Sequence, residues 1–119
     1  MTQIVTRQVD GVTIVDVPRY IMLASSHGPV YTELREIVAD LLANGHKKFV
    51  FDLSQSEAIC PGGIGELIRG FKSVRECGGQ SKLANVQPRV LAVLKLTHLE
   101  TVFDIQKDEA SAIQSFGAA

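Results

Sequence analysis

Residues 47–67 read Lys-Lys-Phe-Val-Phe-Asp-Leu-Ser-Gln-Ser-Glu-Ala-Ile-Cys-Pro-Gly-Gly-Ile-Gly-Glu-Leu, and this segment is the most informative about the fold class. Its aromatic and β-branched run at residues 47–53 precedes a polar loop at residues 54–57, which predicts a buried parallel strand. Apolar residues then recur at helical spacing, at Ile64, Leu67, Ile68, Phe71 and Val74. We expect charged side chains on the opposite side of that helix, at Glu66, Arg69, Lys72, Arg75 and Glu76. Gly78-Gly79 is a typical helix stop, so the stretch encodes a strand, a loop and a helix.

Toward the N-terminus, two runs of alternating polar and apolar residues meet at Asp10-Gly11. This dipeptide is typical of tight hairpin turns, because both central residues of such a turn need a positive φ. Residues 28–44 then show the apolar spacing of a helix, and Gly45 follows as a stop.

Toward the C-terminus, we expect a strand at residues 82–85, a helix opened by Pro88, and a strand around residues 101–105. A last helix should begin at Asp108, a residue type common at helix starts, and should bury Ile113 and Phe116. Strands that alternate with helices after an antiparallel hairpin predict one α/β domain with a mixed sheet over residues 1–119.

The composition limits the classes of function. The chain has 119 residues, of which 45% are hydrophobic and 21% charged, and its net charge is -1. These values are typical of a folded domain, and the absence of a basic cluster argues against a nucleic-acid or anionic-membrane partner. The first residues do not resemble a secretory signal, and the longest apolar run, residues 20–24, is too short to span a membrane. We therefore expect a cytoplasmic protein with two reduced cysteines, Cys60 and Cys77.

The sequence contains no clear set of catalytic or metal-binding residues. His27, His46 and His98 are scattered, and none has a Cys, Ser or carboxylate at a spacing that indicates a catalytic or metal pair. Ser54 and Ser56 lack the glycines of a nucleophile elbow. We expect no enzyme activity, no metal and no cofactor.

The glycines of residues 62–65, Gly-Gly-Ile-Gly, leave several interpretations open. Backbone N–H groups at a helix start attract anions, so a nucleotide or another anion is one candidate ligand, although the full motifs of nucleotide-binding loops are missing. Close internal packing and a flat docking surface for a partner are the other two explanations. Cys60, just before the glycines, is either a redox-sensitive thiol or an ordinary buried residue.

Three stretches of the chain resemble the STAS domain of anti-sigma factor antagonists. They are Phe-Val-Phe-Asp-Leu-Ser at residues 49–54, Ile-Cys-Pro-Gly-Gly-Ile-Gly-Glu-Leu at residues 59–67, and Lys-Leu-Ala-Asn-Val-Gln-Pro-Arg-Val at residues 82–90. The likeness continues through residues 94–99 and 102–103. It implies a mixed sheet with helices packed mainly on one face. It also implies a protein-binding switch whose partner is an anti-sigma factor that acts as a serine kinase.

The loop before the second helix departs from the family pattern Asp-Ser-Ser-Gly-Leu-Gly. Cys60 stands in the place of the Asp, Pro61 in that of the first Ser, and Gly62 in that of the phosphorylated Ser. Family members also carry an acidic residue after the second strand, where this chain has Pro-Arg-Tyr-Ile-Met at residues 18–22. Both differences indicate that phosphorylation does not switch this loop.

The resemblance therefore implies binding to an anti-sigma factor or another signalling protein through Ile59, Cys60, Pro61, Gly62, Gly63, Ile64 and Glu66. The alternative is a nucleotide- or anion-sensing module that uses the backbone of residues 62–65. An exposed edge strand could also pair with a second copy, so a homodimer stays open.

Overall fold

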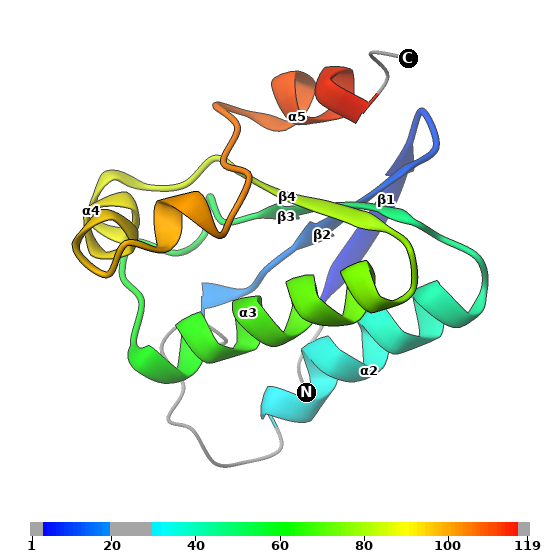
Figure 1. Ribbon diagram of the computed structural model, residues 1–119, viewed down its shortest axis with the longest axis horizontal. Coiled ribbons are helices and arrows are strands. Elements are labelled where there is room, and N and C mark those ends of the chain that lie inside the picture. Colours follow the sequence, from blue (N-terminus) through cyan, green and yellow to red (C-terminus); the bar gives the residue numbers. More distant parts are fainter. Residues whose placement is uncertain (1–3, 20–29, 117–119) are drawn as a thin grey trace.

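The computed structural model describes residues 4–19 and 30–116 (Figure 1). The strands are β1 (Val5–Val9), β2 (Val12–Asp16), β3 (Lys48–Asp52) and β4 (Gln80–Ala84). The helices are α2 (Val30–Ala43), α3 (Pro61–Glu76), α4 (Pro88–Leu96) and α5 (Glu109–Phe116), with a short 3-10 helix, η1 (Leu99–Thr101), after α4. The expected order of strands and helices is confirmed, apart from the strand around residues 101–105.

The four strands form one mixed sheet in the order β1-β2-β3-β4. β1 and β2 are antiparallel, whereas β2, β3 and β4 run parallel to one another. The hairpin turns at Asp10 and Gly11, whose φ angles are 52° and 78°. Both residues thus have the positive φ that the sequence predicts for this turn.

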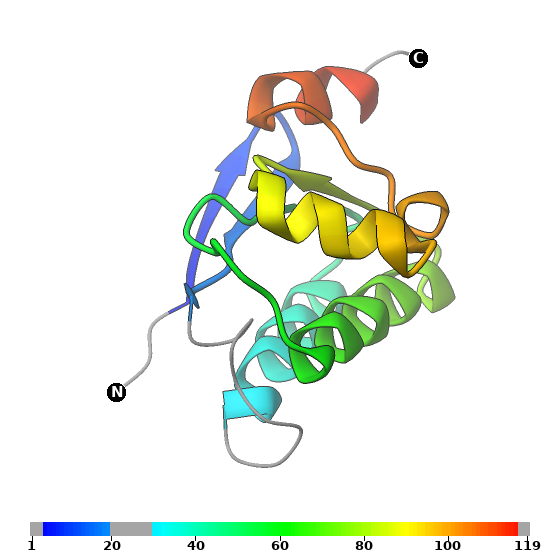
Figure 2. The same cartoon turned by 90° about the vertical axis from the view of Figure 1, so that its left-hand side faces the viewer.

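The helices pack mainly on one face of the sheet, as expected, and α5 covers the other face (Figures 1 and 2). α2 and α3 lie on one face, over the main core, which includes Phe49, Phe51, Leu67, Val74 and Leu83. The shorter α5 covers the other face, where a smaller cluster includes Ile14, Val50 and Ala112. Ile113 and Phe116 pack against this second cluster but are half-buried, and Ala112 is the buried residue of α5.

The turn between α3 and β4 depends on two glycines. Gly78 has a φ of 81°, a backbone angle that residues other than glycine rarely adopt, and it ends the helix. A Cβ on the next residue, Gly79, would lie 2.5 Å from the Lys47 carbonyl oxygen and 2.8 Å from Cγ1 of Val74. Glycine at position 79 therefore lets the end of α3 approach the start of β3 closely.

The segment expected as a strand around residues 101–105 is different in the structure. Its first part belongs to η1, and only one bridge, between Leu83 and Ile105, connects it to β4. The bridge has two backbone hydrogen bonds, from Leu83 N to the Asp104 oxygen and from Gln106 N to the Leu83 oxygen, both 2.8 Å long. Phe103 is buried and packs against Phe71, with ring centroids 4.8 Å apart, so this segment is fixed by packing more than by strand pairing.

Among the helices in the described part of the chain, none has the length and apolar content to cross a membrane.

Candidate functional site

The start of α3 is the candidate site that the sequence predicts. Cys60 precedes the helix in an extended conformation, with φ -106° and ψ 166°, and Pro61 occupies the first turn. Proline suits this place, since its ring fixes φ and the first turn does not need its N–H. The Ile64 amide donates to the Cys60 carbonyl oxygen at 3.1 Å, which closes the first turn. The loop from β3 therefore enters the helix without a side-chain cap.

The residues predicted to bind a partner differ in their exposure. Pro61 is exposed, and four others are half-buried: Ile59, Cys60, Gly62 and Ile64. Gly63 and Glu66 are buried. The accessible part of the site is thus a small apolar surface formed by residues 59–62 and Ile64, with Gly63 and Glu66 beneath it.

Glu66 corrects the expectation that this residue lies on the outer side of the helix. Its exposed fraction is only 1%, and its carboxylate accepts from two arginines. Arg35 of α2 donates to it from Nε, at 3.1 Å to both oxygens, and from Nη2 at 3.0 Å. Arg69, one turn later on α3, donates from Nη1 at 3.1 Å. Helical periodicity places Glu66 correctly on α3 but does not reveal that α2 brings Arg35 beside it.

A group of polar residues lies at the carboxyl ends of the parallel strands, next to the loop that leads to α3. Asp52, the last residue of β3, accepts from the Ser54 amide and from Nδ2 of Asn85, both at 2.8 Å. Asn85 follows β4 with a φ of 55°, a conformation that asparagine tolerates better than most residues. Gln87 donates from Nε2 to the Ser54 carbonyl oxygen at 2.8 Å. These bonds fix the loop after β3 to the segment after β4.

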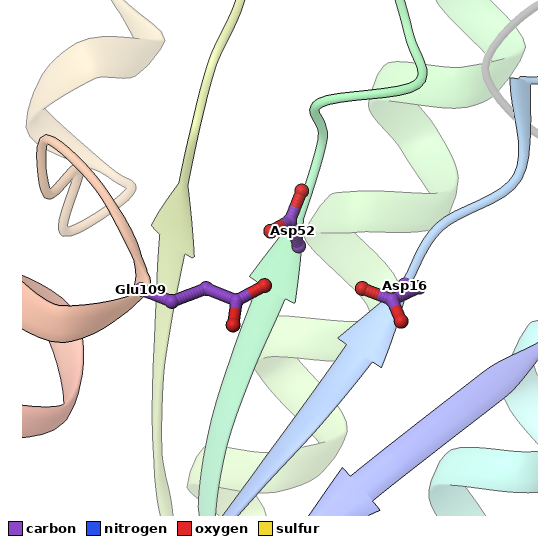
Figure 3. A group of neighbouring side chains, drawn as sticks. All are labelled: Asp16, Asp52 and Glu109. Atoms are coloured by element: carbon purple, nitrogen blue, oxygen red, sulfur yellow. The ribbon is translucent and has the colours of Figure 1, made fainter.

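Three carboxylates meet at the same end of the sheet, on the face covered by α5 (Figure 3). They belong to Asp16 at the end of β2, Asp52 at the end of β3 and Glu109 at the start of α5, and one oxygen of each lies within 4.8 Å of the others. Arg7 of β1 donates to Asp16 at 2.8 Å and to Glu109 at 2.7 Å. Local sequence patterns do not reveal this cluster, because Arg7 and the three carboxylates come from four separate elements.

The charges of this cluster shift its pKa values in opposite directions. Hydrogen bonds from Arg7 to Glu109 and then to Asp16 raise the pKa of Arg7. Burial alone would raise the pKa of Asp52, but contacts with Glu109, Ser54 and Asn85 lower it overall. Arg7 acts to lower the pKa of Glu109, yet the neighbouring Asp52 and burial raise it overall. Each carboxylate thus has a protein donor or a charged neighbour. We interpret Arg7, Asp16, Asp52 and Glu109 together as a polar cluster that fixes α5 to the sheet, and we call this cluster the clasp.

The two histidines in the described part of the chain, His46 and His98, lie at neither place. His46 is half-buried, and its Nδ1 lies 3.5 Å from Oγ1 of Thr13. His98 is exposed, with a φ of 60°. His27 and residues 20–22, which the sequence analysis compared with the acidic segment of the family, lie outside the described residues.

Comparison with known proteins gives a consistent result. A family model for the STAS domain matches residues 3–112. A proposed anti-sigma factor antagonist from Thermotoga maritima is 22% identical, with a TM-score of 0.75 over 94% of this chain and 92% of that chain. An anti-sigma-factor antagonist (STAS) domain protein from Planctomyces limnophilus is 26% identical, with a TM-score of 0.72 over 97% and 98% of the two chains. A chain of the stressosome, a signal integration and transduction hub, is 16% identical, with a TM-score of 0.77 over 94% and 95%.

Proposed function

Because this chain belongs to the STAS domain family, we propose that it is a protein-interaction module of the anti-sigma factor antagonist kind. Its partner is an anti-sigma factor of the serine-kinase type or another signalling protein, and through that partner it regulates transcription. It binds through the surface of residues 59–62 and Ile64 at the start of α3.

The character of this surface supports the proposal. Residues 58–65 carry no charge, and Pro61 is exposed next to half-buried small and apolar residues. Such a surface can be dehydrated by a partner at little electrostatic cost, since the charged side chain of this turn, Glu66, is already buried and paired with arginines. Gly63 and Glu66 then support the surface from beneath, in place of touching the partner.

We further propose that phosphorylation does not switch this surface. Gly62 stands in the place of the family's acceptor serine, and no Ser, Thr or Tyr occurs from Glu57 to Lys72. In the preceding loop, Ser56 is fully buried, whereas Ser54 is exposed. A phosphate at the start of a helix would add about -1.5 to -2 charges on the contact surface. Without an acceptor, the module keeps one binding state there.

A pull-down from the native host tests the binding surface. Wild type and Gly62→Asp are immobilised, and the captured proteins are identified by mass spectrometry. Aspartate near a helix N-terminus is favourable for folding, so this variant places a charge on the surface without removing the helix. We expect wild type to capture a kinase-type anti-sigma factor or other signalling protein, and Gly62→Asp to bind the purified partner at least about tenfold more weakly.

The matched control is Ser73→Asp, which adds the same charge at an exposed position near the other end of α3. It should bind the partner like wild type. Equal affinity of wild type and Gly62→Asp would refute the proposed surface.

Incubation with the captured kinase and ATP tests the second part of the proposal. We expect no phosphate on wild type and phosphate on Ser at position 62 in Gly62→Ser. Stoichiometric phosphate on Ser54 of wild type would overturn the proposal that phosphorylation does not switch this surface. A thermal-shift titration with ATP and GTP addresses the alternative of nucleotide sensing, because a ligand that binds the folded state raises its stability.

A further inference from the structure

β4 is an edge strand whose free side is covered along only part of its length. The N–H and C=O groups of Leu83 form hydrogen bonds with residues 104–106, on the side away from β3. In a parallel ladder the N–H and C=O of one residue point to the same side of the strand, and those of the next residue point to the opposite side. Ser81, two residues earlier, therefore also directs its N–H and C=O outward. Within the described part of the chain, no backbone or side-chain group hydrogen-bonds to them.

A cavity of about 470 Å³ adjoins this open part of the edge. Its walls come from the second half of α3 and from the segment after η1, which runs beside β4 toward α5 (Figure 2). Ile68, Phe71 and Val102 contribute apolar surface, and the first and last of these are 37% and 55% exposed. The volume lies within the usual range of ligand pockets, about 300–1,000 Å³.

The charges around this cavity are mainly positive. Lys72 and Arg75 of α3 line it, are exposed, and make no ion pair with any described residue. Lys82 and Asp104 also line it, but they pair with each other at 2.7 Å. Two uncompensated cations thus flank an open strand edge and an apolar cavity in a protein whose net charge is -1.

We propose that this edge groove binds an extended acidic segment of a partner protein. The groove is formed by Gly79 and residues 80–82 of β4, by Ile68, Phe71, Lys72 and Arg75 of α3, and by Val102. The segment adds beside β4 in line with residues 104–106 and hydrogen-bonds to Ser81. An apolar side chain enters the cavity, and carboxylates face Lys72 and Arg75. A second copy of this chain fits less well, because it would bring the same cations against each other.

Selection from a displayed library of twelve-residue peptides tests this proposal, with the wild-type chain as target. We expect the enriched peptides to alternate apolar and acidic residues. Their affinity for Lys72→Glu/Arg75→Glu should fall at least about tenfold, since attraction becomes repulsion at two positions. Lys95→Glu on α4 is the control, because it reverses an exposed charge outside the groove. It should bind like wild type.

Amide resonances then locate the peptide. Enriched peptides should shift the Ser81 amide and slow its hydrogen exchange, while the Gly62→Asp variant should bind them with unchanged affinity. Failure to enrich any peptide, or equal affinity for the double charge-reversal variant and wild type, would overturn the proposal. A dimer in analytical ultracentrifugation that dissociates in Lys72→Glu/Arg75→Glu would also overturn it, in favour of pairing between copies. Loss of peptide binding in Gly62→Asp would also overturn the proposal, because it would place the peptide on the surface of residues 59–62 and Ile64. The other results do not concern that surface, so the two proposals fail separately.

Discussion

Glu66 and Glu109 are both held by arginines, but on opposite faces of the sheet and in opposite arrangements. The Glu66 carboxylate is fully buried between α2 and α3, and the side chains of Arg35 and Arg69 are 47% and 55% exposed. On the other face, the cation of Arg7 lies among the carboxylates, of which Asp16 and Glu109 are 22% and 25% exposed.

The comparison shows that the loss of stability on breaking an ion pair depends on whether the charged group that remains is buried. If the arginines are removed from Glu66, a carboxylate stays buried without a counter-charge. If Glu66 is replaced, the guanidinium groups of the half-exposed arginines can be hydrated instead. On the α5 face Arg7, Asp16 and Glu109 keep contact with water, and only Asp52 is buried, so each change should have a smaller effect.

The largest effect should come from Arg35→Met together with Arg69→Met. These changes keep much of the apolar stems but leave the Glu66 carboxylate unpaired in the interior. We expect the free energy of unfolding near pH 7 to fall by about 3–5 kcal/mol, as measured by urea denaturation. A loss below about 1 kcal/mol would show that water reaches Glu66 and that the contrast between the two faces is wrong.

Arg7→Met should have a smaller effect. It removes both ion pairs of the clasp and leaves three carboxylates close together. Asp16 and Glu109 are partly hydrated, and the buried Asp52 keeps its hydrogen bonds from Ser54 and Asn85. We expect a loss of about 1–2 kcal/mol in the same measurement. In about 1 M NaCl, where the screening length is roughly 3 Å, the difference from wild type should shrink. A loss as large as that of the double arginine variant would contradict the comparison.

Glu66→Met tests the asymmetry directly. It removes the buried charge and fills its place with an apolar side chain of similar length, while Arg35 and Arg69 become hydrated. We expect stability within about 1 kcal/mol of wild type, since apolar replacements of buried ion pairs are often neutral or stabilising. A loss of the same size as in the double arginine variant would show that the ion pairs themselves contribute the stability.

Glu109→Gln should have the smallest effect, about a few tenths of a kcal/mol near pH 7, and its sign should depend on pH. The pKa of Glu109 is raised in the folded state, so the folded chain binds this proton more tightly than the unfolded chain. Wild type should therefore gain stability as pH falls through the raised pKa toward the ordinary value of about 4.3. The Gln variant should lack this gain.

The measurement is the free energy of unfolding of both proteins at several pH values between about 7 and 4.5. The other titrating groups are shared, so the difference between the two curves reports Glu109 together with its contact to Asp52. Parallel curves would contradict the raised pKa. Below about pH 4 both proteins should lose stability, because the pKa values of Asp52 and Asp104 are lowered in the folded state.

Local features of the sequence predicted much of the fold. Asp10-Gly11 predicted the hairpin, Pro61 and Gly78 marked the two ends of α3, and Asp108 preceded α5, where its Oδ1 accepts from the Ser111 amide at 2.8 Å. Each of these signals acts within a few residues, through backbone geometry or a capping bond. They are therefore visible without knowledge of the rest of the chain.

The strand expected around residues 101–105 shows where such signals fail. Its β-branched and aromatic residues suit a strand, but η1 and the packing of Phe103 against Phe71 leave only one bridge to β4. Strand propensity describes a fit to a half-buried surface and does not show whether the chain reaches the edge of a sheet. The residues of the candidate sites likewise come together only through contacts between distant parts of the chain.

The order of the elements, the uncharged stretch at residues 58–65 and the absence of a hydroxyl at position 62 follow from residue type and short spacing. Long-range packing, in contrast, places Glu66 inside the protein, joins β1 to α5 through Arg7, and sets an open edge of β4 beside a basic groove. Arg35 and Glu66 are 31 residues apart in the chain, and Arg7 and Glu109 are 102 apart. Such pairs meet through the packing of whole helices and strands, which no local pattern specifies.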